Sequence, residues 1–157
     1  MELWDYCLTF KTIIMKAGEF TFTMIKPKAV QLGNIVPILH EIDVAGFSVI
    51  AMKMTQLSHT QACRFYAVHK DRPFFNDLVE FMSSGPVVAA VLQKVNAVED
   101  YRKLIGNTDP AKAEEGTIRK KFAISMQANA VHGSDSDENA LIEANFFFSQ
   151  FEIFKSV

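Results

Sequence analysis

The chain has 157 residues, of which 49% are hydrophobic, enough to bury the core of one domain but too few residues for a second domain. A formal net charge of -2 excludes a general electrostatic affinity for nucleic acid, although it allows a local phosphate pocket. Only Cys7 and Cys63 are cysteines, and no apolar run approaches the roughly 20 residues that span a bilayer. We therefore expect a protein of a reducing compartment, the cytoplasm, without a disulfide scaffold or a membrane segment.

Residues 1–18 do not have the pattern of a secretory signal. Acidic Glu2 and Asp5 stand where such a signal is basic, and Lys11 and Lys16 interrupt the apolar residues that follow. We interpret residues 1–18 as an N-terminal extension and expect the folded domain to span residues 19–157.

The domain begins with a strand, a helix and a second strand. Residues 20–25 alternate apolar and hydroxyl side chains, which predicts a half-buried strand that ends at Lys26 and Pro27. A helix with apolar residues at helical spacing follows, and Asn34 is expected to cap its first turn. Residues 47–54 alternate again and predict the second strand.

The middle of the chain predicts two helices and a buried strand. Ser58 and Gln61 have the spacing of a capping box, so a helix should begin there. A second helix is expected over residues 75–82, because Leu78, Phe81 and Met82 form an apolar stripe. Residues 86–92 form a continuous apolar run of strand length, which indicates a central strand buried on both faces.

The last third predicts a helix, a loop, a short helix, a strand and a final helix. In order, these are a helix capped by Asn96, a loop over 107–115, a helix over 117–122, a strand near 127–131 and a helix over 137–145. The resulting order β-α-β-α-α-β-α-α-β-α implies an α+β sandwich, in which helices cover one antiparallel-rich sheet. The pattern alone leaves the order of the strands open.

Residues 129–139 bring together an imidazole, a glycine, two hydroxyls and several acids. Ser134 or Ser136, followed by acids, suits the N-terminus of a helix, so His132 should lie where a strand gives way to a helix. A single histidine is more often structural than catalytic. The residues around His132 shift the interpretation towards a catalytic histidine.

The pattern Asn129-x-x-His132-Gly-Ser-Asp-Ser resembles the active-site signature of nucleoside diphosphate kinases. The resemblance extends from about Phe20 to Phe148, and several separate motifs in the right order are more specific than one histidine. The other motifs are Thr23-Met-Ile-Lys26-Pro27, Tyr66, Arg72-Pro73-Phe74, Met82-Ser-Ser-Gly-Pro86, Arg102, Gly106-x-Thr108-x-Pro110 and Gly116-Thr-Ile-Arg119. It implies a ferredoxin-like α/β sandwich with a four-stranded antiparallel sheet.

The resemblance also implies a reaction that maintains the pools of (deoxy)nucleoside triphosphates. His132 would take the γ-phosphate of a nucleoside triphosphate, typically ATP, and pass it from a phosphohistidine to a nucleoside diphosphate in a ping-pong exchange. An imidazole of ordinary pKa, about 6.5, is largely neutral at physiological pH and needs orientation more than deprotonation. Glu143 matches the acid that orients the ring, although its spacing alone would favour a solvated helix residue.

Cationic and hydroxyl residues match the family's nucleotide-binding positions. Lys26 matches a lysine that contacts ribose and phosphate, and Arg102 and Arg119 match arginines whose planar guanidinium suits phosphate oxygens. Without the resemblance, Lys26 and Arg102 would be surface charges. Thr108 matches a donor to phosphate, although a role in the turn is the simpler explanation.

Aromatic and polar residues complete the implied site. Tyr66 matches a tyrosine near the transferred phosphate, or it packs in the core, and Phe74 matches the ring that stacks on the nucleobase. Asn129 would read the sugar together with Lys26. No glycine-rich phosphate loop is present, and Asp135 would hold Mg²⁺ through water while phosphates and other waters complete the shell.

Relatives in this family assemble from dimers into tetramers or hexamers, so a homo-oligomer is implied, with no membrane or specific nucleic-acid partner. Two features depart from the family pattern, Lys28 in place of an acid and the charged loop 107–115. A serine hydrolase built from Ser134, His132 and Asp135 is disfavoured, because neighbours along one backbone do not easily converge as a triad. A catalytically idle binding module keeps the fold, but the intact set of site residues argues against it.

Overall fold

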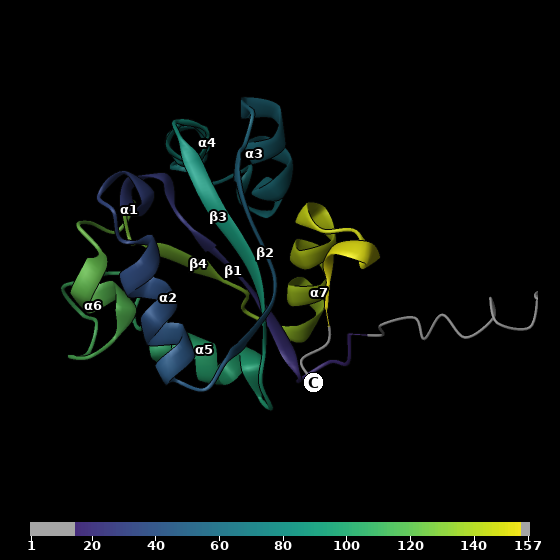
Figure 1. Cartoon of the computed structure of the whole chain (residues 1–157). Helices are drawn as coiled ribbons and strands as arrows, with labels where there is room; N and C mark the ends of the chain where they lie inside the picture. The colour runs from purple at the N-terminus through teal and green to yellow at the C-terminus, as the bar shows by residue number, and fades with distance from the viewer. Residues whose placement is uncertain (1–14, 155–157) are drawn as a thin grey trace, which may run out of the picture.

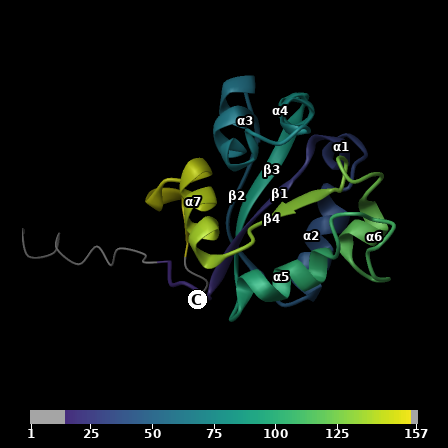
Figure 2. The ribbon, with the colours of Figure 1, turned by 180° about the vertical axis from the view of Figure 1, so that it is seen from behind.

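The structure is a computed structural model that describes residues 15–154. Within that range, four strands form one sheet with helices on both faces (Figures 1 and 2). The strands are β1 (Phe20–Ile25), β2 (Ser48–Gln56), β3 (Pro86–Gln93) and β4 (Val131–Gly133). Their order is β2-β3-β1-β4 and every pair is antiparallel, which confirms the predicted ferredoxin-like fold.

The two middle strands carry the core on both faces of the sheet. Alternate residues of β1 and β3 enter one of two apolar clusters, as the pleat of a strand requires. One cluster lies under α3 (His59–Phe65), α4 (Phe75–Ser83) and α7 (Asp137–Phe147). The other lies under α2 (Ile35–Val44), α5 (Ala97–Ile105) and α6 (Ile118–Phe122). The prediction that residues 86–92 form a central buried strand is confirmed.

The helix starts were predicted with mixed success. The capping box is confirmed, since Ser58 Oγ accepts from the Gln61 N–H at 3.2 Å and Gln61 Oε1 accepts from the Ser58 N–H at 2.9 Å. Asn96 occupies the N-cap position of α5 as predicted, but the predicted side-chain cap is wrong: its φ of 56° is left-handed and its side chain makes no capping hydrogen bond. Asn34 likewise precedes its helix without a side-chain cap. The apolar pattern does not indicate the short helix α1 (Pro27–Gln31), which starts directly after β1 because Pro27 suits a first helical position as well as the end of a strand.

The last strand begins later than predicted. A tight turn precedes it, in which the Val131 N–H donates to the Asn129 carbonyl at 2.9 Å and Ala130 has a φ of 70°. A non-glycine residue in that region is strained. As a result β4 spans Val131–Gly133 rather than 127–131, and His132 lies inside the strand, opposite Met24 of β1.

The chain ends of the described range lie against the sheet and its helices. The Gly18 carbonyl accepts from the Ala97 N–H at 3.2 Å, while residues 1–14 of the predicted extension lie outside the described residues. After α7, a 3₁₀ turn (Gln150–Glu152) leads to Phe154, whose N–H donates to the Ile50 carbonyl of β2 at 2.7 Å. No helix in residues 15–154 is long and apolar enough to cross a membrane.

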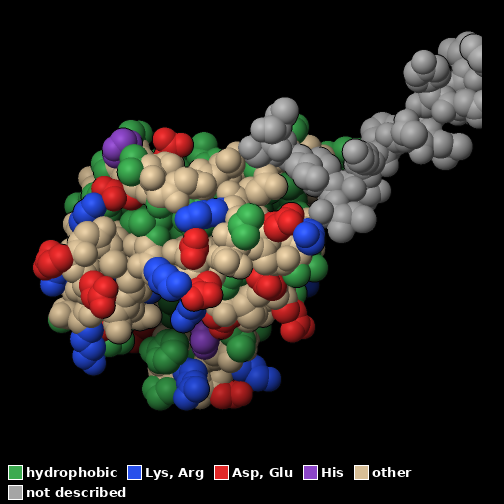
Figure 3. Space-filling view, turned by 90° about the horizontal axis from the view of Figure 1, so that it is seen from below, with side chains coloured by type: hydrophobic (Ala, Val, Ile, Leu, Met, Phe, Trp, Pro, Cys, Tyr) green, Lys and Arg blue, Asp and Glu red, His purple; other side chains and the backbone are tan. Residues whose placement is uncertain are grey.

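The surface carries charges of both signs. On the face seen in Figure 3, Lys and Arg side chains are interspersed with Asp and Glu side chains. Such a mixed face agrees with the small net charge of the chain and gives no extended basic surface there for a nucleic-acid backbone.

Candidate active site

The His132 imidazole is held between aromatic rings. Its centroid lies 5.3 Å from that of Phe65, 6.0 Å from that of Phe22 and 6.1 Å from that of Tyr66. Phe22 belongs to β1, Phe65 is the last residue of α3 and Tyr66 follows it. Packing on one face of the sheet therefore sets the plane of the imidazole. The side chain keeps 20% of its surface exposed, so one part of the ring remains accessible.

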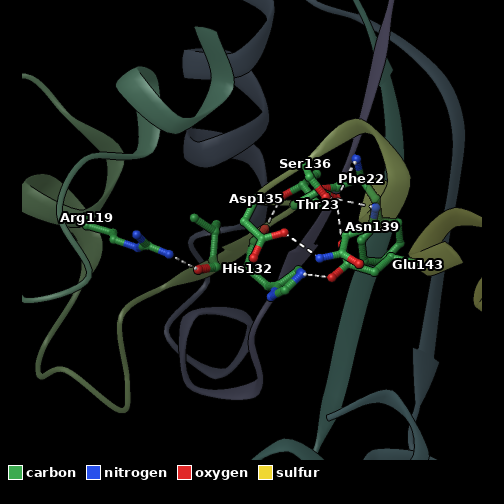
Figure 4. Close-up of polar contacts among 10 residues, drawn as sticks. Phe22, Thr23, Arg119, His132, Asp135, Ser136, Asn139 and Glu143 are labelled. Atoms are coloured by element: carbon green, nitrogen blue, oxygen red, sulfur yellow. Dashed lines mark hydrogen bonds and ion pairs between the residues drawn. The ribbon is translucent and has the colours of Figure 1, made fainter. Parts of the chain in front are cut away.

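Glu143 of α7 lies beside one ring nitrogen, as Figure 4 shows. The distance from His132 Nε2 to Glu143 Oε1 is 2.9 Å, although the oxygen lies off the direction of the ring N–H. The second carboxylate oxygen accepts from Ser134 Oγ at 2.5 Å, and Ser134 is fully buried. The carboxylate is therefore fixed from behind, and Nδ1 is the ring nitrogen on the side away from it.

The role of Ser134 was missed in the sequence. Alternation in a strand places residues two apart on one face, so a contact between Ser134 and a partner of His132 was a detectable signal. Ser134 Oγ also accepts from the Phe22 N–H at 3.3 Å, which ties it to β1. Buried and bonded in this way, Ser134 is not placed as the nucleophile of a hydrolase.

Tyr66 joins His132 to the predicted stacking residue. Its ring is buried, and burial together with Glu143 raises the pKa of Tyr66, so its hydroxyl stays protonated. The His69 ring follows at 6.5 Å from Tyr66 and at 5.8 Å from Phe74. Phe74 is 50% exposed immediately before α4, so its ring has a face free to stack.

Two buried cations lie at the end of β1. Lys26 is 6% exposed, and burial followed by the nearby Arg119 charge lowers the pKa of Lys26 to about 7. Arg119 donates to the Gly106 carbonyl at 2.9 Å and to the Val131 carbonyl at 3.1 Å. Arg119 thus holds both the loop after α5 and the residue next to His132, and burial lowers its own pKa.

Unpartnered polar atoms gather at these residues. Within residues 15–154, five buried side-chain polar atoms lack a hydrogen-bond partner. Four of them belong to predicted site residues: Tyr66 Oη, Arg119 Nε, Asn129 Oδ1 and His132 Nε2, of which the last faces Glu143 and the other three have no polar partner. Buried polar groups are normally satisfied, so this concentration indicates a place built for a polar ligand.

Three predicted residues lie at the exposed margin. Arg102 and Asp135 line a cavity of about 400 Å³ between the beginnings of α5 and α7. Asp135 Oδ1 accepts from Asn139 Nδ2 at 2.6 Å, which holds the pKa of Asp135 below its ordinary value, with smaller contributions from Arg102 and His132. Thr108 is exposed in the predicted loop, two residues after the carbonyl that Arg119 holds.

The described residues include no group of three or more His, Cys, Asp or Glu side chains that could hold a metal ion. A single ionised carboxylate at Asp135 still fits Mg²⁺, which usually takes one or two carboxylates and completes its shell with phosphates and waters. The contact of Asp135 with Mg²⁺ through water stays a prediction.

Comparison with known proteins gives the family. The family model for nucleoside diphosphate kinases matches residues 19–153. The chain belongs to the nucleoside diphosphate kinase family. A nucleoside diphosphate kinase of Flavobacterium psychrophilum is 60% identical over 138 residues, which cover 88% of this chain and 99% of that protein. The relative from Lawsonia intracellularis is 56% identical over 85% of this chain and 97% of its own length.

Solved nucleoside diphosphate kinases share the fold. The Aquifex aeolicus enzyme has a TM-score of 0.84 at 44% identity, covering 86% of this chain and 98% of that one. The Halobacterium salinarum enzyme, solved in complex with CDP, also has a TM-score of 0.84, at 35% identity over 89% and 93% of the two chains. Membership of the nucleoside diphosphate kinase family makes this chain an enzyme of the transferase class.

Proposed function

We propose that this nucleoside diphosphate kinase transfers the γ-phosphate of a nucleoside triphosphate, typically ATP, to a nucleoside diphosphate through a phosphohistidine on His132. The observation that carries the proposal is the imidazole with Nε2 2.9 Å from Glu143 Oε1. A carboxylate at Nε2 favours the ring proton on that nitrogen, which leaves the lone pair on Nδ1. His132 Nδ1 is therefore the attacking atom.

The exchange has two balanced halves. In the first, the Nδ1 lone pair forms a bond to the γ-phosphorus while the bond to the bridging oxygen breaks, and the nucleoside diphosphate leaves with that electron pair. In the second, a terminal phosphate oxygen of another diphosphate attacks the same phosphorus and the N–P bond breaks. Such an exchange maintains the pools of (deoxy)nucleoside triphosphates.

The buried polar groups supply the binding energy that this reaction needs. Lys26 and Arg119 lie where negative phosphate oxygens would offset their desolvation, since both have lowered pKa values caused by burial. Arg102 and Thr108 would reach the phosphates from the margin, and Asn129 would read the sugar. The CDP complex of the Halobacterium salinarum relative supports a nucleotide as the ligand.

Phe74 would stack on the nucleobase, and the Tyr66 hydroxyl would donate a hydrogen bond to the transferred phosphate. Stacking tolerates any base because every base has a π face, so a broad choice of nucleotides is expected. Asp135 would hold Mg²⁺ through water. The metal ion, when bound, neutralises charge on the phosphates.

A second copy of the chain is the partner that the surface favours. Several large apolar side chains are exposed on β2 and α7, and a second copy of the chain would cover them. They are Val49, Met52, Met54, Leu141 and Ile142. We propose a homo-oligomer built from dimers, a tetramer or a hexamer, whose size light scattering measures directly. A cytoplasmic location stays a prediction.

The test is labelling by γ-labelled ATP and Mg²⁺ without an acceptor. The protein should take up phosphate that survives alkali and is lost in acid, as phosphohistidine does, and should release it to any added diphosphate with ping-pong kinetics. His132→Ala should abolish labelling and turnover and keep nucleotide binding. The matched control is His40→Ala, which removes an exposed histidine of α2.

Acid-stable label, or acid-labile label that persists in the His132→Ala variant, would show that another residue carries the phosphate. Nucleotide binding by the unmodified protein without any labelling or turnover would instead support the idle binding module.

A further inference from the structure

Two buried hydroxyls lie directly behind the backbone of His132. Thr23 of β1 is 1% exposed, and its Oγ1 donates to the His132 carbonyl at 2.9 Å (Figure 4). Tyr101 of α5 is fully buried, and its hydroxyl lies 2.6 Å from Thr23 Oγ1. None of the roles assigned above to phosphate, sugar or base contact uses either residue.

The direction of these hydrogen bonds follows from the available hydrogens. A carbonyl can only accept, so the single hydroxyl hydrogen of Thr23 is donated to the His132 carbonyl. Tyr101 must then be the donor to Thr23, and burial raises the pKa of Tyr101, which keeps that hydrogen in place. The sequence of bonds is Tyr101 O–H to Thr23 O–H to the His132 carbonyl, which we name the hydroxyl relay.

The same tyrosine also packs against the next residue of the strand. A Cβ placed on Gly133 would lie 3.1 Å from both Cδ1 and Cε1 of Tyr101 and 2.9 Å from Ile105 Cδ1. On its other side the Tyr101 ring meets Phe47 edge-on, with centroids 5.6 Å apart. The ring therefore has little room to move without displacing β4. The position of α5 is thus fixed against the strand that carries His132.

We propose that Tyr101 and Thr23 are positioning residues for phosphoryl transfer, acting through the hydroxyl relay on the backbone of His132. The proposal rests on the proposed function. Arg102 follows Tyr101 on α5 and faces the exposed margin, so the relay connects the helix of a predicted phosphate contact to the strand of the nucleophile. Loss of the relay should loosen the approach of Nδ1 to the phosphorus, and transfer depends steeply on that geometry.

The variants remove one hydroxyl at a time and keep the shape. Tyr101→Phe keeps the ring against Gly133, Thr23→Val removes the hydroxyl, and Thr23→Ser retains it. The matched control is Thr21→Val, because Thr21 lies on the same strand and face, is fully buried, and has a hydroxyl without a partner among the described residues.

Rapid-quench labelling measures the rate of phosphoenzyme formation against ATP concentration. In Tyr101→Phe and Thr23→Val the saturating rate should fall roughly threefold to tenfold, which is what one lost hydrogen bond allows. The ATP concentration at half-maximal rate should change less than about twofold, and Thr23→Ser and Thr21→Val should stay near the unmodified rate. The double variant should be no slower than Thr23→Val alone, because both changes break one relay.

The ¹³C resonance of the His132 carbonyl gives a readout that does not depend on turnover, and it should move in Tyr101→Phe and Thr23→Val but not in Thr21→Val. A moved resonance with an unchanged rate overturns the positioning role, and so does an unmoved resonance or an equal loss of rate in Thr21→Val. An unmodified protein that takes no label contradicts the proposed function itself, so the two failures appear in different samples.

Discussion

Replacing Lys26 with Met tests the environment of the end of β1 without any substrate. Lys26 is 6% exposed, and burial together with the Arg119 charge lowers its pKa from 10.5 to about 7. Between those two pH values the unfolded chain binds more protons than the folded chain, so the free energy of unfolding rises as the pH rises. Met has nearly the same length as Lys but no charge, so Lys26→Met should remove this dependence.

The size of the effect follows from the difference between the two pKa values. At about 1.36 kcal/mol for each pH unit, that difference corresponds to a limiting value of about 5 kcal/mol, of which about 4 kcal/mol is gained between pH 7 and 10.5. Between pH 7 and pH 9, where other groups interfere less, the contribution of Lys26 is about 2 kcal/mol. With an ordinary dependence on urea, this moves the unfolding midpoint by roughly 1 M.

Urea unfolding of both proteins at closely spaced pH values is the assay. The unmodified protein should gain about 2 kcal/mol relative to Lys26→Met between pH 7 and pH 9, and the variant should be the more stable of the two at pH 7. Lys28→Met, at a partly exposed position two residues along α1, controls for the loss of a lysine charge. A difference between the unmodified protein and Lys26→Met that is constant from pH 7 to pH 9 would refute the reasoning.

Three other changes give separate tests. Phe74→Ala should raise KM for several nucleotides together, because a stacking platform contributes roughly 1–3 kcal/mol with little base preference; an effect on one base alone would contradict this. Gly133→Ala should cost about 1–3 kcal/mol in urea unfolding, since its Cβ would lie 2.9 Å from Ile105 Cδ1, and an unchanged midpoint would show that α5 yields easily. Removal of residues 1–18 should leave exchange activity largely intact; a chain starting at residue 15 controls for the bond between Gly18 and Ala97, and failure of the shorter chain to fold would contradict the prediction.

The pattern of apolar residues predicted the sheet better than the ends of its elements. Residues 20–25 and 87–92 are buried on both faces of the sheet. The prediction that residues 20–25 form a half-buried strand is wrong, because all six are buried: β1 lies between β3 and β4 with helices on both faces. The beginning of β4 depends instead on the strained turn at Ala130. The local composition does not predict this turn, because alanine rarely adopts a positive φ. Asn96 shows the converse, since a residue type that often caps a helix here adopts a left-handed backbone and leaves its side chain unused.

The residues of the site were likewise easier to predict than the contacts between them. The motif around His132 predicted the nucleophile that we propose, and the resemblance predicted Glu143 and Lys26, whose surroundings the structure then describes. Contacts between residues far apart in the sequence could not be read from it: Thr23 and Tyr101 are 78 positions apart and meet only because α5 packs under the sheet. Ser134 differs, because its partner Glu143 is only nine residues further along and alternation in the strand could have indicated the contact.

The unpartnered buried groups of Tyr66, Arg119 and Asn129 bear on how this sequence can be evolved in the laboratory. Each such group costs roughly 1–3 kcal/mol in the free protein, so replacing Tyr66 by Phe or Asn129 by an apolar residue should raise the melting temperature. A library selected only for survival of heating would therefore accumulate substitutions at these positions and lose activity. In the proposed function a bound nucleotide satisfies these groups, so selection in the presence of a nucleotide should favour the chains that keep them.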